Sequence, residues 1–134
     1  LVASVVADQL AAQLNLVNDL PRGLASVESF LRDYLSPAHR DNLAGGCPSA
    51  ALLDEIGRCD IAVREAYTDG ASAMISAIAR HLDDGDAAAA TQRAIGLFTL
   101  LVGSLQAARA VTDPELSERI LAAAYANAMT LATA

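Results

Sequence analysis

Cysteine is the residue type in this sequence that is best placed to carry chemistry. Cys47 follows Gly45 and Gly46, which free the backbone to leave a preceding helix, and it precedes Pro48, which favours the first turn of the next helix. A thiol at a helix N-terminus can be reactive and act as a redox sensor. The alternative is a small, reduced, buried side chain. We expect that packing role for Cys47 and Cys59, with no disulfide between them, because no secretion signal is visible.

Histidine and acidic residues offer little further chemistry. His39 and His81 lie far apart, without the spacing of a metal-binding motif around either, so we expect surface or capping roles and no metal site. The acidic pairs stand at helix edges, where solvation is expected. The sequence has no Gly-rich phosphate loop, no Gly-x-Ser-x-Gly motif and no Cys-x-x-Cys pair. We therefore expect neither an enzyme nor a cofactor.

Length and composition favour one helical domain. A chain of 134 residues can bury a core without disulfides or metal. Hydrophobic residues make up 54% of it but aromatic residues only 4%, so the apolar content is largely alanine, which favours closely packed helices. The net charge of −7 argues against DNA binding by this chain itself, because such binding rests on Lys and Arg neutralising phosphates. We expect a single all-α domain over residues 1–134.

Six segments carry apolar residues at helical spacing, and no segment shows sustained strand alternation. Asp60 and Asp86 are expected to cap two of these helices, and Thr112 or Asp113 to cap the last, with Pro114 in its first turn. Residues 36–46 are expected to end the second helix. The predicted helices run over residues 2–17, 24–35, 48–57, 61–82, 87–111 and from 114 onward.

No segment indicates a membrane or secreted protein. The longest uncharged apolar run, residues 94–108, is shorter than the roughly 20 residues that span a bilayer, so we interpret it as a buried helix. Residues 1–10 lack the basic start of a signal peptide and already contain Asp8. A cytoplasmic protein is expected.

Small residues on the last two predicted helices favour a homodimer. Gly96 and Gly103 are seven residues apart, and alanines recur every four residues near the C-terminus, so backbones can approach closely on these faces. Two such helices can join a partner's pair in a four-helix bundle, or they can pack inside one chain. The predicted interface residues are Gly96, Leu100, Gly103, Ala107, Leu121, Ala124 and Ala128.

Large aromatic and flexible side chains gather on three predicted helices of this alanine-rich chain. Such side chains suit an adaptable pocket for a mostly apolar small molecule, although they can also fill an ordinary core. We expect the pocket between the second, fourth and fifth helices. The predicted ligand-binding residues are Phe30, Tyr34, Tyr67, Met74, Phe98 and Leu101.

The chain resembles the C-terminal domain of the tetracycline-repressor (TetR) family of bacterial transcription regulators. The resemblance covers essentially the whole chain, and its best marker is the Gly46-Cys47-Pro48 step followed by an acid at Glu55. The other segments that carry it are "FLRDYLSPAHRDN", "AYTDGASAMISAIARHL", "ATQRAIGLFTLLVGSLQAARAV" and "DPELSERILAAAYANAM". It implies an all-α orthogonal bundle that dimerises through its last two long helices and encloses an effector pocket whose occupancy alters DNA binding.

One feature of the family has no counterpart here. Its full-length members carry a basic helix-turn-helix domain before this region, and the residues "LVASVVADQL" would correspond to the helix that links the two domains. We expect that the DNA-binding domain has been removed, because the chain starts inside a helical pattern, and the alternative is a chain that evolved without it. The expected function is effector sensing coupled to DNA release. The alternative function is a standalone helical dimerisation or adaptor protein without a ligand.

Overall fold

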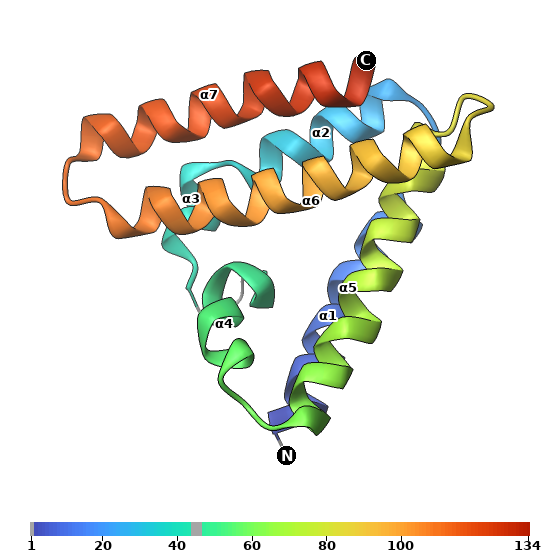
Figure 1. The fold of residues 1–134 in the computed structure, drawn as a ribbon. Helices are drawn as coiled ribbons and strands as arrows, with labels where there is room; N and C mark the ends of the chain where they lie inside the picture. The colour runs from blue at the N-terminus through green and yellow to red at the C-terminus, as the bar shows by residue number, and fades with distance from the viewer. Residues whose placement is uncertain (1, 44–46) are drawn as a thin grey trace.

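The computed structural model describes residues 2–43 and 47–134. Within these residues the chain is helical throughout, without strands, and forms seven helices (Figure 1). The pair α6 and α7 runs antiparallel, with α2 behind it, while α1 and α5 lie side by side at a steep angle to that pair. The helices are α1 (Val2–Asn18), α2 (Leu24–Tyr34), α3 (Pro37–Asp41), α4 (Pro48–Gly57), α5 (Ile61–Leu82), α6 (Ala87–Ala110) and α7 (Pro114–Thr133).

Aspartate side chains set the starts of the three longest helices. The Asp60 side chain accepts a hydrogen bond from the Val63 N–H at 3.2 Å, and Asp86 accepts one from Ala89 at 3.1 Å. Asp113 caps α7 by accepting from the Glu115 N–H at 3.0 Å. Each carboxylate satisfies a backbone donor that the helix cannot. The predicted caps are confirmed, and Asp113 is the one that starts α7.

The helix α3 corrects the prediction of six helices. Residues 36–46 were expected to form only a connection, but Ser36 caps a helix of five residues by accepting the His39 N–H at 3.1 Å, and Pro37 takes its first position. A Ser-Pro pair is a helix start, because the hydroxyl satisfies a free N–H and proline needs none. Gly45 and Gly46, expected to end the preceding helix, lie outside the described residues.

The core has two parts, which meet along α5. The larger cluster packs α2, α5, α6 and α7 together, and the smaller one joins Val6 and Leu10 of α1 to Ile56 and Val63. The helices α1 and α5 approach closely at Gly70, where an added Cβ would lie 2.9 Å from the Cβ of Leu10. Only glycine leaves room for that contact, so Gly70 sets the distance between α1 and α5.

The helix α6 is longer than its uncharged run suggested. Its 24 residues meet the length and hydropathy of a membrane span. However, α6 packs against α3, α4, α5 and α7, and it carries arginines on either side of the run. Arg93 donates to the carbonyls of Leu131 and Ala132 at 3.0 and 2.9 Å, which ties α6 to the end of α7. In this fold α6 is the central helix of the bundle.

Candidate functional site

An apolar cavity lies between the helices that were predicted to hold a ligand. Its volume is about 20 Å³, room for about one water molecule. Aromatic, aliphatic and sulfur-containing side chains form its wall, with Gln13 of α1 as one polar member. Five of the six predicted ligand-binding residues line it, namely Phe30, Tyr34, Met74, Phe98 and Leu101.

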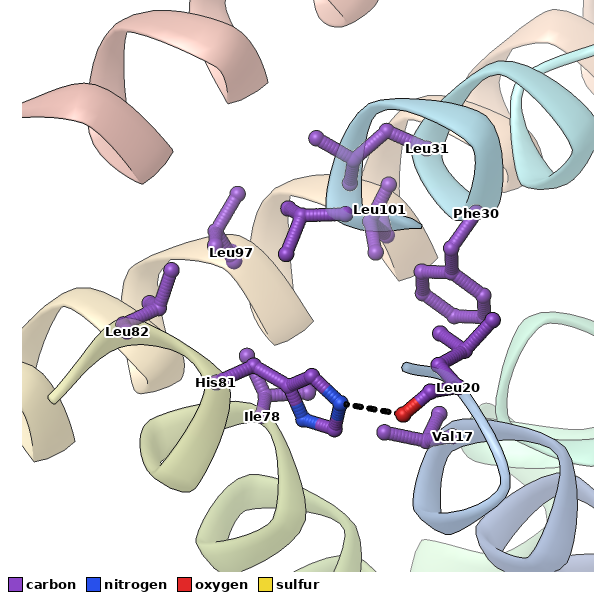
Figure 2. A pocket seen from close by; sticks show the side chains of 10 residues that line it. Val17, Leu20, Phe30, Leu31, Ile78, His81, Leu82, Leu97 and Leu101 are labelled. Carbon is purple, nitrogen blue, oxygen red and sulfur yellow. Dashed lines mark hydrogen bonds between the residues drawn. The ribbon is translucent and has the colours of Figure 1, made fainter. Parts of the chain in front are cut away.

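A second apolar cavity of the same volume adjoins the first. It lies towards the end of α5 and the connection between α1 and α2, where Figure 2 shows the imidazole of His81 pointing at the carbonyl of Leu20. Phe30, Ile78 and Leu101 line both cavities. These three side chains therefore form the partition between two halves of one apolar interior.

Both cavities are far smaller than a typical ligand pocket, which holds roughly 300–1,000 Å³. A ligand must therefore displace side chains to enter. Phe30 is half-buried, and the unbranched Met74 side chain can adopt several shapes. The structure describes a closed form of this interior.

Tyr67 lies outside both cavities, which corrects its prediction as a lining residue. Its hydroxyl shares a hydrogen bond of 2.9 Å with Ser49 of α4, and its ring packs on the smaller core cluster. Burial raises the pKa of this phenol, and Ser49 opposes the rise. Tyr67 precedes Met74 by two helical turns and so shares its face, but the cavity does not extend that far down α5.

Polar contacts at the Tyr34 end of the first cavity involve His39, which was expected only at the surface or as a cap. Its Nδ1–H donates to the Tyr34 carbonyl at 2.7 Å, and its Nε2 accepts the Cys47 N–H at 3.0 Å. Its ring also meets the Tyr34 ring edge-on at 4.7 Å. Burial lowers the pKa of His39, in keeping with a neutral ring that both donates and accepts. His39 thus caps the end of α2 and fixes the start of α4.

Arg109 completes this end of the site, and sequence reasoning missed it. Its Nε donates to the Arg40 carbonyl and its Nη2 to the His39 carbonyl, both at 3.0 Å. Its remaining nitrogen, Nη1, is buried and has no hydrogen-bond partner in the described chain. The sequence signal was weak, because Arg109 stands merely as the first charge after a long uncharged run.

The cysteines have the predicted packing role and are both free. Cys47 is buried and contributes to the wall of the first cavity. The thiol of Cys59 donates to the Glu55 carbonyl at 3.3 Å. Across residues 2–43 and 47–134, no three His, Cys, Asp or Glu side chains gather as metal ligands would.

The predicted interface residues do not share one face of the chain. Gly103 and Ala107 are exposed, and Gly96 and Leu100 are half-buried. The remaining three, Leu121, Ala124 and Ala128, are at most 4% exposed and belong to the larger core cluster. Because they pack inside this chain, they leave no surface for a partner, and that part of the predicted interface is corrected.

A comparison with protein families found a matching family. Residues 23–124 match the family described as tetracycline repressor-like, C-terminal domain. The chain belongs to this family. The match runs from the start of α2 into α7, so it includes Tyr34, His39, Cys47, Met74 and Arg109. A search of curated proteins found none that matches the chain.

Proposed function

We propose that this tetracycline repressor-like domain is the effector-sensing and dimerisation domain of a bacterial transcription regulator, and that effector binding is coupled to DNA release. Its net charge of −7 disfavours DNA contact by the domain itself. The observation that carries the proposal is the cavity between α2, α5 and α6. In an alanine-rich chain, both phenylalanines and one of the two methionines line it. Such a wall suits an apolar small molecule.

The coupling would run through the first helix. Gln13 of α1 lines one cavity and Val17 lines the other, so a ligand that enlarges either cavity acts on α1. By the family resemblance, residues 1–10 would correspond to the helix that links this domain to a DNA-binding domain, although α1 precedes the matched residues 23–124. A ligand that binds one placement of α1 more tightly shifts the population towards that placement. No movement of the whole bundle is required.

The outer faces of α6 and α7 support a homodimer. Between Arg93 and Arg109, and again after Arg119, the sequence has no charged residue, although it contains 16 acidic and 9 basic residues in all. Ile95 and Leu116 are 46% and 39% exposed on these helices. None of the described helices covers the side of the pair that faces the viewer in Figure 1. An uncharged surface with exposed aliphatic side chains is typical of a dimer interface.

The small volume of the two cavities favours a second candidate function, that of a protein that binds no ligand. If Phe30, Met74 and their neighbours only fill a core, the chain is a dimerisation or adaptor protein without a ligand. The two candidates agree on the dimer and differ on whether any small molecule binds the folded chain.

A thermal denaturation screen with hydrophobic metabolites and drugs separates the two candidates. A ligand present at about a hundred times its dissociation constant stabilises the folded state by about 2.7 kcal/mol, which raises Tm by several degrees. We expect Met74→Ala and Phe98→Ala to abolish the shift, while Met129→Ala, on α7, retains it. A hit whose shift survives Met74→Ala and Phe98→Ala contradicts the proposed site. A broad screen without any hit supports the adaptor.

A further inference from the structure

Two buried polar atoms in the described chain have no hydrogen-bond partner, the Tyr34 hydroxyl and Nη1 of Arg109. Tyr34 is only 7% exposed and lines the first cavity. Buried polar groups in folded proteins nearly always have partners, because an unpaired one loses its bonds to water without replacement. Neither donor has a hydrogen-bond partner within the described chain, so a bound ligand could supply one.

The two donors lie within electrostatic reach of each other. Burial raises the pKa of the Tyr34 hydroxyl far above its ordinary value, the nearby Cys47 thiol adds to the rise, and the positive charge of Arg109 opposes it. The hydroxyl is consequently a neutral donor at any physiological pH. Cys47 lies close to the hydroxyl, although the geometry of that contact is not a hydrogen bond. The hydroxyl comes from the last turn of α2 and the guanidinium from the last turn of α6. His39 links them, because its carbonyl accepts from Arg109 and its ring contacts the Tyr34 ring. Arg109 itself lines a neighbouring open pocket between the end of α6 and α3.

Within the part of the chain that the structure describes, the charge of Arg109 has no acidic partner. Arg32, Arg40 and Arg58 all form ion pairs with carboxylates. Arg109 instead donates to the backbone carbonyls of His39 and Arg40, which are neutral acceptors. A half-buried cation without a counter-charge, in a chain of net charge −7, is a place where an anion gains a strong hydrogen bond.

The shape of the interior favours a long apolar group. The two cavities are separated by the side chains of Phe30, Ile78 and Leu101. Displacement of Phe30 joins them into one apolar channel from Tyr34 to the region of Leu82 and Val17. Figure 2 shows that the half of the channel away from Tyr34 is lined mainly by aliphatic side chains, and that the imidazole of His81 there is hydrogen-bonded to the Leu20 carbonyl. The channel is thus polar at one end and apolar along its length.

We propose, on the basis of the sensing role above, that the effector is an amphiphilic monocarboxylate with a single long apolar chain. Its carboxylate accepts hydrogen bonds from the Tyr34 hydroxyl and from Nη1 of Arg109, and its chain lies between Phe30, Met74 and Leu101. A carboxylate has two oxygens and can accept from both unpaired donors. A single negative charge also suits an acidic protein better than a polyphosphate, which the other carboxylates would repel.

Calorimetric titration with three probes of equal chain length tests this assignment. The probes are decanoate, 1-decanol and decyltrimethylammonium, each used below its aggregation concentration. We expect decanoate to bind the chain at least about tenfold more tightly than decanol, which corresponds to one hydrogen bond to a charged group. We expect no binding of decyltrimethylammonium, because its cation would face Arg109.

Tyr34→Phe should remove about tenfold or more of the decanoate affinity while it leaves decanol affinity unchanged. Tyr125→Phe, a change of the same kind on α7, should alter neither. Arg109→Gln should abolish the preference for decanoate over decanol. If the Arg109→Gln variant does not fold, the Tyr34→Phe result alone tests the carboxylate assignment. Equal binding of acid and alcohol overturns the carboxylate assignment and leaves the sensing role standing. Absence of decanoate binding also overturns it, whereas the broad screen above decides the sensing role separately.

Discussion

Nη2 of Arg109 donates a hydrogen bond of 3.0 Å to the carbonyl oxygen of His39, which lies 70 residues earlier in the sequence. This contact fixes α3 against the end of α6. The placement of α3 in turn sets the His39 ring, whose Nε2 accepts the Cys47 N–H and whose edge meets Tyr34. One arginine therefore organises the polar end of the cavity through backbone carbonyls.

The unpaired hydroxyl of Tyr34 predicts a substitution that stabilises the chain. Tyr34→Phe removes a buried donor without a partner, so we expect the free energy of unfolding to rise by up to about 1 kcal/mol. Tyr67→Phe is the matched control, because its hydroxyl is bonded to the fully buried Ser49, and it should lower that free energy by about 1 kcal/mol. Urea denaturation measures both. A Tyr34→Phe variant less stable than the parent would show that the hydroxyl has a structural partner.

The close approach of α1 and α5 predicts opposite effects for two glycine substitutions. Gly70→Ala places a methyl group against Leu10 and should destabilise the chain by about 1–3 kcal/mol, despite the better helix propensity of alanine. Gly103→Ala meets no neighbouring atom within 4 Å and should stabilise the monomer fold by up to about 1 kcal/mol. Chemical denaturation of the two variants side by side decides this. A stabilising Gly70→Ala would mean that α1 can move away freely.

Protonation of His39 should weaken the fold. Its pKa is lowered in the folded state by burial, so the unfolded chain binds the proton more tightly. Stability is then greatest above the unfolded-state value of about 6.5 and falls as pH drops through it towards the folded-state value. Melting temperatures across this range should show the decline, and His39→Asn should flatten it. An unchanged slope in that variant would assign the effect to other groups.

If the proposed homodimer forms through the uncharged outer face of α6, a charge there should disrupt it. Gly103→Arg would bury a cation without a partner in the helix contact, at a cost of several kcal/mol, and should give monomer or aggregate. Gly57→Arg on α4, equally exposed and without neighbours within 4 Å, should remain dimeric. Sedimentation velocity distinguishes these species. A parent chain that is monomeric at tens of micromolar would rule out the homodimer.

Local signals in the sequence were enough for most helix boundaries. Asp60 and Asp86 act within one turn of their own helix, so their caps could be predicted without tertiary contacts. The start of α3 had a local signal as well, the Ser36-Pro37 pair, but so short a helix persists only with distant contacts such as that with Arg109, which the sequence does not show. The role of Arg109 could not be predicted from the sequence, because its acceptors are backbone carbonyls about 70 residues away, and any residue type has such a carbonyl.

Residue type predicted the cavity wall better than residue spacing did. Phe30, Met74 and Phe98 line the cavity, and they stand out in the sequence as rare large side chains in an alanine-rich chain. Tyr67 shares the face of Met74, but helical periodicity does not tell where along a helix a cavity ends. Small residues were ambiguous in the same way. Ala124 and Ala128 allow close packing, and spacing alone does not distinguish a contact within the chain from one with a partner.

The two methionines permit the most direct test of ligand sensing. Met74 lines the cavity, whereas Met129 lies on α7 away from it. NMR spectra of the chain labelled with ¹³C at the methionine methyl groups can be recorded during titration with the compounds that raise its Tm. We expect the Met74 resonance to shift in a saturable manner and the Met129 resonance to change much less. Stabilising compounds that leave the Met74 resonance in place would contradict a binding site between α2, α5 and α6.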